Sequence, residues 1–177
     1  MTTGKVSWDE YYFEDIPSVV VLVLFSKIQS DIRNTEANVI DFLKKDPILI
    51  EELKKLDGKK IIFTNGSRKH ALNVTKRIGI DQYFDDIFDI VDCEFVPKPA
   101  IQPYKKLVEK HKIDPKLCGF VEDIARNLKP AYEMGMKTVW IENDEPWAKK
   151  YSDGDFINFK TKNLSEFLKQ INLLKAA

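Results

Sequence analysis

The sequence has few cysteines and no pattern that would turn them into a disulfide framework or a zinc site. Cys93 and Cys118 are the only two among 177 residues, and no Cys-x-x-Cys spacing occurs. Small disulfide-stabilised domains carry more cysteines, and structural zinc sites place theirs in closely spaced pairs. We therefore expect a reducing, cytoplasmic setting.

Long apolar runs are also lacking. The longest spans residues 19–25, far short of the ~20 residues that a membrane-spanning helix needs. Asp9, Glu10, Glu14 and Asp15 precede it, whereas a secretory signal peptide opens with basic residues. These features predict a soluble protein with no membrane partner.

An excess of either charge is absent, because 28 basic residues balance 28 acidic ones. A balanced surface offers no electrostatic reason to bind nucleic acid. Apolar residues make up 44% of the chain, enough for a hydrophobic core. The length indicates one domain, or one domain with a small appendage, and the sequence does not indicate an oligomeric state.

What the sequence does contain is a regular alternation of short apolar segments and helical segments. Such alternation predicts an α/β fold with a mainly parallel sheet covered by helices on both faces. Ligands bind such sheets beyond the carboxyl ends of the strands. The expected strands are 19–25, 60–63, 88–91, 118–121 and 138–141; the expected helices are 47–56, 67–78, 103–112, 125–134 and 163–174, with a further possible helix at 26–43.

The first polar strand end is Phe63-Thr64-Asn65-Gly66-Ser67. A hydroxyl, a glycine and a helix start in this order suit an oxyanion, because backbone N–H groups and the helix N-terminus point to one place. In this reading Thr64 bonds a phosphate oxygen. The alternative is an ordinary turn in which Ser67 caps the following helix.

The second polar position is Lys98, between Pro97 and Pro99. Prolines restrict their own backbone and that of the preceding residue, so this segment should be extended and should hold the ammonium in a fixed place. A fixed cation can neutralise phosphate charge or keep a carboxylate ionised. The alternative is a lysine that faces solvent.

The third is the acidic pair Glu122-Asp123, followed by Asn127, after the apolar segment at 118–121. Carboxylates at a buried strand end are costly unless a cation pairs with them, and hard oxygen ligands suit Mg²⁺. The alternative is a set of acids that favours a helix N-terminus, with Asp123 as its cap.

Several stretches in this order resemble bacterial hydrolases of the haloacid dehalogenase (HAD) superfamily that are described as pyrimidine 5′-nucleotidases. The matching stretches are residues 63–71, 84–90, 96–104, 122–128 and 135–139. Hydroxyl, lysine and acidic pair follow the order of HAD motifs two, three and four. Response-regulator receiver domains use similar groups but place the acids first, and dehalogenases of the superfamily lack a magnesium-binding acid pair.

The resemblance implies a Rossmann-like three-layer core and Mg²⁺-dependent hydrolysis of a small phosphomonoester such as a nucleoside monophosphate. It implies that Thr64 and Lys98 act in catalysis and bind phosphate. Asn65 and Gly66 would also contact the phosphate.

The resemblance further implies that Asp123 and Glu122 hold the metal, with Asn127 in support. Residues 41–177 would form the HAD-like core, and the cap domain that selects substrates would be reduced or missing. Substrate identity is therefore not predicted.

The chain departs from the family at motif one, Asp-x-Asp-x-Thr, which occurs nowhere in the 177 residues. In the family its first aspartate attacks phosphorus and its second acts as general acid and base. One interpretation is a truncated or rearranged gene product with an atypical segment at 1–40. In the other, residues 19–25 replace the motif-one strand, with Ser26 at the nucleophile position and Ile28 at the acid/base position.

The architecture makes a structural demand on this segment. The motif-one strand is central, and its loss would leave unpaired backbone groups on both neighbouring strands. We therefore predict that residues 19–25 form the central parallel strand. We expect little or no hydrolysis, and a non-catalytic phosphate- or nucleotide-binding protein or a fragment without independent function is the alternative.

Overall fold

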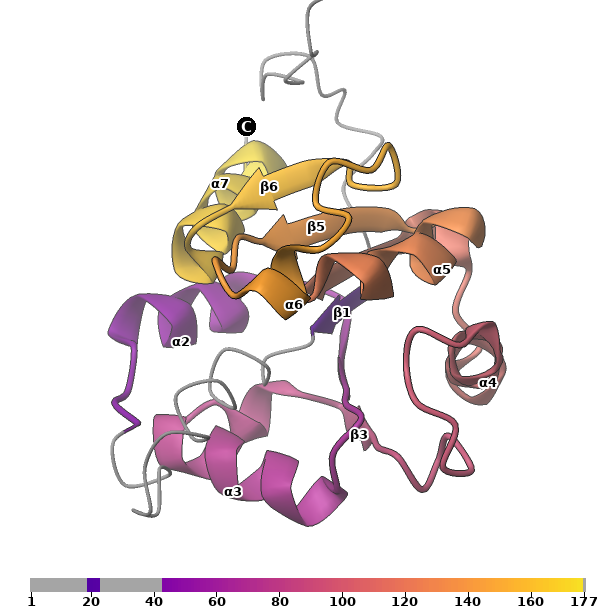
Figure 1. Cartoon of the computed structure of the whole chain (residues 1–177). Helices are drawn as coiled ribbons and strands as arrows, with labels where there is room; N and C mark the ends of the chain where they lie inside the picture. Colours follow the sequence, from indigo (N-terminus) through magenta and orange to yellow (C-terminus); the bar gives the residue numbers. More distant parts are fainter. Residues whose placement is uncertain (1–18, 23–42, 177) are drawn as a thin grey trace, which may run out of the picture.

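The computed structural model describes residues 19–22 and 43–176, which form a six-stranded parallel sheet with helices on both faces (Figure 1). The strand order is β3-β2-β1-β4-β5-β6, and each neighbouring pair is parallel. This arrangement confirms the predicted α/β core. The strands are β1 (Val19–Leu22), β2 (Lys59–Phe63), β3 (Asp86–Phe88), β4 (Cys118–Glu122), β5 (Lys137–Ile141) and β6 (Phe159–Thr161).

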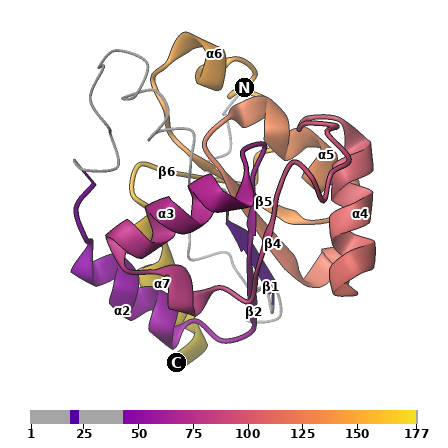
Figure 2. The same ribbon diagram turned by 90° about the horizontal axis from the view of Figure 1, so that it is seen from below.

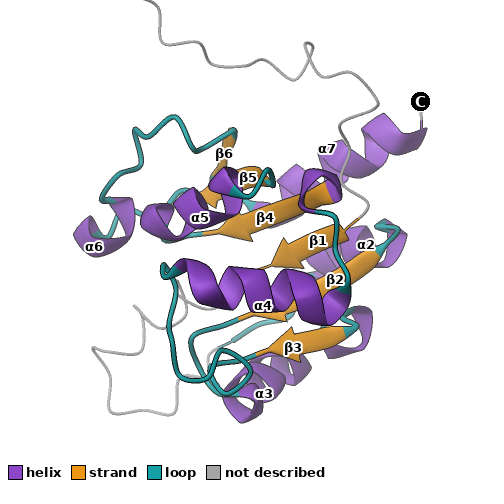
Figure 3. Cartoon of the chain, turned by 90° about the vertical axis from the view of Figure 1, so that its right-hand side faces the viewer, coloured by secondary structure: helices purple, strands orange, loops and turns teal. Residues whose placement is uncertain are grey.

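The helices complete three layers. Figures 2 and 3 show α4 and α5 on one face of the sheet and α2, α3 and α7 on the other. No helix within 43–176 combines the length and the apolar character needed to cross a membrane. The α-helices are α2 (Pro47–Lys55), α3 (Arg68–Ile78), α4 (Ile101–His111), α5 (Leu128–Glu133), α6 (Pro146–Lys149) and α7 (Leu164–Ala176), and the 3-10 turns are Asp81–Tyr83, Pro115–Leu117 and Ala125–Asn127.

Successive residues of the buried strands pack into apolar cores on opposite faces of the sheet. Phe120 packs into the core beneath α4 and α5, whereas its neighbour Val121 packs into the core beneath α2 and α7. Phe63 lies at the centre of the first core, with ring centroids 5.2 Å from Tyr104 and 6.1 Å from Phe120. These aromatic contacts fix Phe63, the last residue of β2, against α4 and β4.

Strand β1 occupies the central position expected for the apolar run at 19–25. Val21 pairs with Ile61 of β2 and with Phe120 of β4, and Val20 is buried. The backbone of this short strand thus pairs with β2 on one side and with β4 on the other. This is the central position that we predicted from the need to pair the backbone groups of β2 and β4. Residues 23–25 and all but the last residue of the expected helix at 26–43 lie outside the described residues.

The third strand lies earlier in the chain than the sequence predicted. The prediction of a strand at 88–91 was wrong after Phe88, because Ile90 and Val91 form a turn. The Asp89 carboxylate accepts hydrogen bonds from the backbone N–H groups of Val91 and Asp92, and this closes the turn. The predicted helix at 125–134 is likewise divided into a 3-10 turn and α5, while β6 and α6 were not predicted.

Gly79 ends α3 in the left-handed conformation, with φ of +78°, as the sequence predicted. Gly79→Ala should lower the free energy of unfolding by about 1 kcal/mol, because a Cβ disfavours positive φ. Urea denaturation measures the loss. Asn73→Ala on the exposed side of the same helix is the control, and an equal effect of the two changes would contradict the prediction.

Candidate active site

Three polar segments meet at the carboxyl edge of the sheet, where the strand-end rule placed them. Leu22 of β1 is in register with Ile62 of β2 and Val121 of β4. Thr64 and Asp123 each follow their registered residue by two positions. The two therefore lie at the same level, at the ends of β2 and β4 on either side of β1.

Thr64 opens a tight turn into α3. Its side chain is buried, and its Oγ1 accepts a hydrogen bond of 2.9 Å from the Gly66 N–H. A Cβ at position 66 would lie 3.3 Å from that oxygen, so glycine permits the close approach. Ser67 caps α3 by accepting from the His70 N–H. The turn thus presents a hydroxyl and a helix N-terminus at the same strand end.

Lys98 is fixed at both its backbone and its ammonium. Its N–H donates to Asn65 Oδ1 at 2.8 Å, and its carbonyl accepts from Asn65 Nδ2 at 3.3 Å. The buried Nζ donates to the Phe63 carbonyl and to Glu122 Oε2, both at 2.9 Å. Because β1 separates β2 from β4, this one ammonium joins two strand ends that are not neighbours. Asn65 acts here as the residue that holds Lys98.

Glu122 is fully buried, and both of its carboxylate oxygens have protein partners. Oε2 accepts from Lys98 and from Asn127 Nδ2. Oε1 accepts from the N–H groups of Asp123 and Ile124. A carboxylate bound in this way anchors the lysine and the loop, and it has few lone pairs left for a metal.

Asp123 differs from its neighbour because one of its oxygens is unpartnered. Oδ2 accepts from Asn143 Nδ2 at 3.3 Å, whereas the buried Oδ1 has no partner among the described residues. Burial, reinforced by the negative charge of Glu122, raises the pKa of Asp123 to about 8. Asp123 does not cap the following turn, whose N-terminus has no side-chain cap. A cation at Oδ1 would lower the cost of ionising this carboxyl group.

Asn127 supplies a second unpartnered oxygen. Its Oδ1 is buried without a partner in the described part of the chain, while its Nδ2 binds Glu122 and its carbonyl accepts from the Tyr104 hydroxyl at 2.6 Å. Two orphaned oxygens from residues four apart fit a hard cation such as Mg²⁺, which keeps several waters as ligands. Within 43–176 no group of three or more His, Cys, Asp or Glu side chains forms a complete metal cage.

Three residues of the site were missed by sequence reasoning. Asn143 orients the Asp123 carboxylate, Trp140 Nε1 donates to the Asp123 carbonyl at 2.9 Å, and Tyr104 holds the Asn127 backbone. Asn143 follows the carboxyl end of β5, so the rule that ligands gather at strand ends could have found it. Ser26 and Ile28, the residues considered for the nucleophile and acid/base positions, lie outside the described residues.

Comparisons with known proteins agree with this geometry. The sequence pattern of the haloacid dehalogenase-like hydrolases matches residues 12–141. The pyrophosphatase PpaX of Bacillus mycoides strain KBAB4 is 29% identical over 126 residues, which are 70% of this chain and 58% of that protein. The bifunctional epoxide hydrolase 2 of Mus musculus is 38% identical over 65 residues, which are 36% of this chain and 11% of that protein.

A solved structure, the L-2-haloacid dehalogenase from Xanthobacter autotrophicus, superposes with a TM-score of 0.59. The match has 17% sequence identity and covers 85% of this chain and 68% of that chain. This likeness shows a shared fold. The chain spans less than two thirds of the length of both curated relatives.

Proposed function

Because the chain belongs to the haloacid dehalogenase-like hydrolases, whose sequence pattern spans residues 12–141, we propose that it carries the phosphate and Mg²⁺ sites of a phosphohydrolase. The observation that carries the proposal is the Lys98 ammonium, held at 2.9 Å from both the Phe63 carbonyl and Glu122. These two partners directly precede Thr64 and Asp123, whose Oδ1 has no partner among the described residues. A cation, a hydroxyl and a metal-binding carboxylate at one sheet edge suit a phosphate dianion.

The phosphate would be bound by the turn that follows β2. The Thr64 hydroxyl and the Asn65 N–H would donate to its oxygens, while the Gly66 N–H holds Thr64 Oγ1 in place, and the N-terminus of α3 favours negative charge there. Lys98 would neutralise charge without moving, because Asn65 holds its backbone at both polar groups.

The metal would be held by Asp123 Oδ1, with Asn127 Oδ1 as a second protein oxygen or as a contact to a metal-bound water. Glu122 would support the site through Lys98 and would not bind the metal itself, because its oxygens already have four donors. When bound, Mg²⁺ would offset phosphate charge and keep Asp123 ionised.

A small phosphomonoester, with a nucleoside monophosphate as the first choice, is the substrate class we propose. The resemblance of residues 63–71 and 122–128 to pyrimidine 5′-nucleotidases supports it. The similarity to a pyrophosphatase, over 70% of this chain, supports phosphate chemistry in general. The acidic pair Glu122-Asp123 favours this chemistry over dehalogenation, because a dehalogenase needs no magnesium.

Hydrolysis by these 177 residues should be slow, because no Asp-x-Asp-x-Thr occurs in them. A phosphoaspartyl step needs a carboxylate beside the phosphorus, and residues 23–26, which follow β1, are Val, Leu, Phe and Ser. The same observation favours a second candidate function, a non-catalytic protein that binds phosphate or a nucleotide and does not turn it over.

The proposal is tested by binding and turnover together. Calorimetry should detect inorganic phosphate binding that depends on Mg²⁺ in the wild type, and Asp123→Asn should weaken it by about tenfold or more, because the amide lacks the negative charge that binds the metal. Hydrolysis of p-nitrophenyl phosphate should stay close to the rate in buffer for both proteins. Asp57→Asn, at an exposed position away from the sheet edge, is the charge-matched control.

Each outcome of these measurements tests a different part of the proposed function. Robust turnover that Asp123→Asn abolishes would establish a working phosphohydrolase and overturn the expected impairment. Binding without turnover would favour the non-catalytic candidate. Absence of phosphate binding in the wild type at millimolar phosphate and Mg²⁺ would contradict the proposed site.

A further inference from the structure

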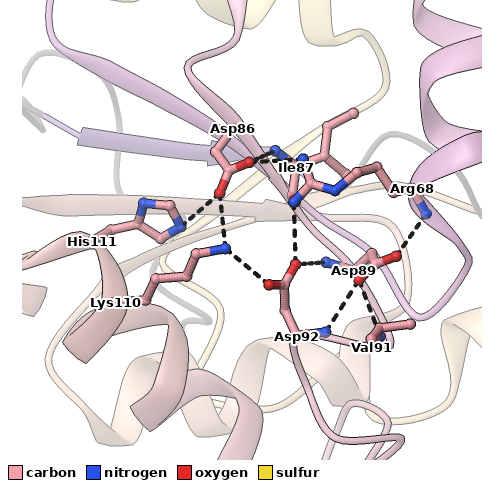
Figure 4. Close-up of polar contacts among 8 residues, drawn as sticks. All are labelled: Arg68, Asp86, Ile87, Asp89, Val91, Asp92, Lys110 and His111. Carbon is pink, nitrogen blue, oxygen red and sulfur yellow. Dashed lines mark hydrogen bonds and ion pairs between the residues drawn. The ribbon is translucent and has the colours of Figure 1, made fainter.

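A closed ring of ion pairs lies beside the site, at the outer edge of the sheet (Figure 4). Arg68, at the start of α3, binds Asp86 Oδ1 at 2.9 Å and Asp92 Oδ2 at 3.3 Å. Lys110, near the end of α4, binds the other oxygens of the same two acids at 3.1 and 2.9 Å. We call these four residues the Arg68 ring.

Arg68 does more than close the ring. Its guanidinium also donates to the Ile87 carbonyl, and the Ile87 N–H donates to Asp86 Oδ1. The backbone polar groups of Ile87, in the edge strand β3, are thus bonded to side chains of the ring. One guanidinium therefore bonds the edge strand and both carboxylates of the ring.

The ring lies where two functional loops are joined. We call residues 64–67 the phosphate loop and residues 89–98 the lysine loop. The Ile90 N–H donates to the Gly66 carbonyl at 3.2 Å, and the Asp89 carboxylate accepts from the Arg68 N–H at 2.8 Å. The reciprocal bonds of Asn65 and Lys98 join the same loops at their far ends.

The lysine loop depends on these hydrogen bonds to the phosphate loop, because it contains no helix or strand of its own. Glu94 and Phe95 within it have positive φ of 52° and 63°, a conformation that costs free energy for residues other than glycine. Such a backbone keeps its shape only where surrounding bonds impose it. Asp92 binds both Arg68 and Lys110, and Glu94 pairs with Lys106, so α3 and α4 hold the loop from two sides.

The two acids of the Arg68 ring depend on both of its cations. Burial opposes ionisation of Asp86 and Asp92, but hydrogen bonds from Arg68 and Lys110 outweigh it and set the pKa of both acids below the ordinary value. Both are therefore anions at neutral pH. Burial lowers the pKa of the neighbouring His111, so this residue adds little positive charge. Without Arg68, two carboxylates that share one ammonium would repel each other.

We propose that Arg68 is a positioning residue for Lys98, and that it acts by holding the lysine loop against the phosphate loop. Loss of its guanidinium leaves Asp92 with Lys110 as its one remaining cation among the described residues and removes the side-chain donor of the Ile87 carbonyl, so the lysine loop is held less firmly against α3. The strained turn at residues 94–95 then relaxes, and the bonds between Asn65 and Lys98 open more often. The role of Lys98 in phosphate binding rests on the proposed function, whereas its placement does not.

The test compares Arg68→Met and Arg68→Lys with the wild type by amide hydrogen exchange. In Arg68→Met the Lys98 amide, which binds Asn65 Oδ1, should exchange about tenfold faster relative to the Val139 amide in β5. Arg68→Lys should be intermediate, because a lysine keeps the charge but cannot bond Asp86, Asp92 and Ile87 together. Calorimetry should show phosphate binding weakened by about tenfold in Arg68→Met.

Asn172→Ala separates positioning from a general loss of stability. It removes bonds between α7 and Glu52 of α2, which do not involve either loop, so it should lower the melting temperature and leave the Lys98-to-Val139 exchange ratio unchanged. An unchanged ratio in Arg68→Met would overturn the inference. If the wild type binds no phosphate, the proposed function fails, and the exchange ratio alone still decides whether Arg68 positions Lys98.

Discussion

Lys98→Met should lower the free energy of unfolding by about 3–5 kcal/mol, because it leaves the Glu122 carboxylate buried without its cation. The Lys98 and Glu122 side chains are 2% and 0% exposed, so water cannot replace the lost ammonium. The Phe63 carbonyl loses its lysine donor as well. Urea denaturation at pH 7 measures the change.

Lys98→Met combined with Glu122→Gln should recover most of that loss. A glutamine at 122 is neutral, and its oxygen can keep accepting from the two backbone N–H groups. Its amide nitrogen can donate to Asn127 once the Asn127 amide turns to present its oxygen. Lys105→Met, at an exposed position of α4, should change stability by less than about 0.5 kcal/mol. A double variant no more stable than Lys98→Met would show that the buried charge is not the cause.

The strand-end residues could be predicted because strand ends are marked locally in the sequence. Thr64 and Asp123 each follow a run of buried residues, and parallel pairing brings such positions to one edge. The central place of residues 19–22 followed from a different argument. A parallel sheet cannot leave a gap between β2 and β4, and one apolar run in the chain was suited to fill it.

The sequence could not predict how the neighbouring carboxylates divide their roles. Glu122 and Asp123 are adjacent acids, but successive residues of a strand and its extension point in opposite directions. Glu122 consequently meets Lys98, whereas Asp123 meets Asn143. The partners of Asp123 come from β5 and the segment after it, 17 and 20 residues away, and no periodic pattern signals such contacts.

The boundary of β3 shows a different reason for failure. Ile90 and Val91 are β-branched and apolar, which predicts a strand. The carboxylate of Asp89 instead bonds the N–H groups of Val91 and Asp92, and a local side-chain bond of this kind competes with strand pairing. The turn that Asp89 closes begins the lysine loop. Asp89 is therefore both the reason why the predicted strand ends early and a residue that shapes the site.

The stability of the metal-free protein should fall as the pH rises from about 4 to 8, because of Asp123. The pKa of its carboxyl group is raised from 3.8 to about 8 by burial and by the charge of Glu122. Between these values the folded protein holds a proton that the unfolded chain releases. The stabilisation is complete below the unfolded pKa and is lost as the pH rises through the folded pKa, at up to about 1.4 kcal/mol per pH unit.

Asp123→Asn should remove this slope, because the amide stays neutral throughout. Other groups titrate as well, and the lowered pKa of Asp86 and Asp92 gives stability that is lost as the pH falls below about 4. The difference in unfolding free energy between wild type and Asp123→Asn isolates the contribution of Asp123 from theirs. Urea denaturation in the presence of a chelator, at intervals from pH 5 to 9, gives that difference, and Asp57→Asn should keep the wild-type slope.

Mg²⁺ should restore the stability that is lost when Asp123 ionises, in the wild type but not in Asp123→Asn. A cation at Asp123 Oδ1 favours the ionised carboxylate, so Mg²⁺ should raise the melting temperature more at pH 8 than at pH 5. Asp123→Asn, which keeps the shape but lacks the charge, should be more stable than the wild type without metal at pH 8 and should gain little from Mg²⁺. Equal stabilisation of both proteins by Mg²⁺ would place the cation elsewhere. A flat pH profile of the metal-free wild type would mean that water solvates the Asp123 carboxyl group when no metal is bound, so that its pKa is not raised.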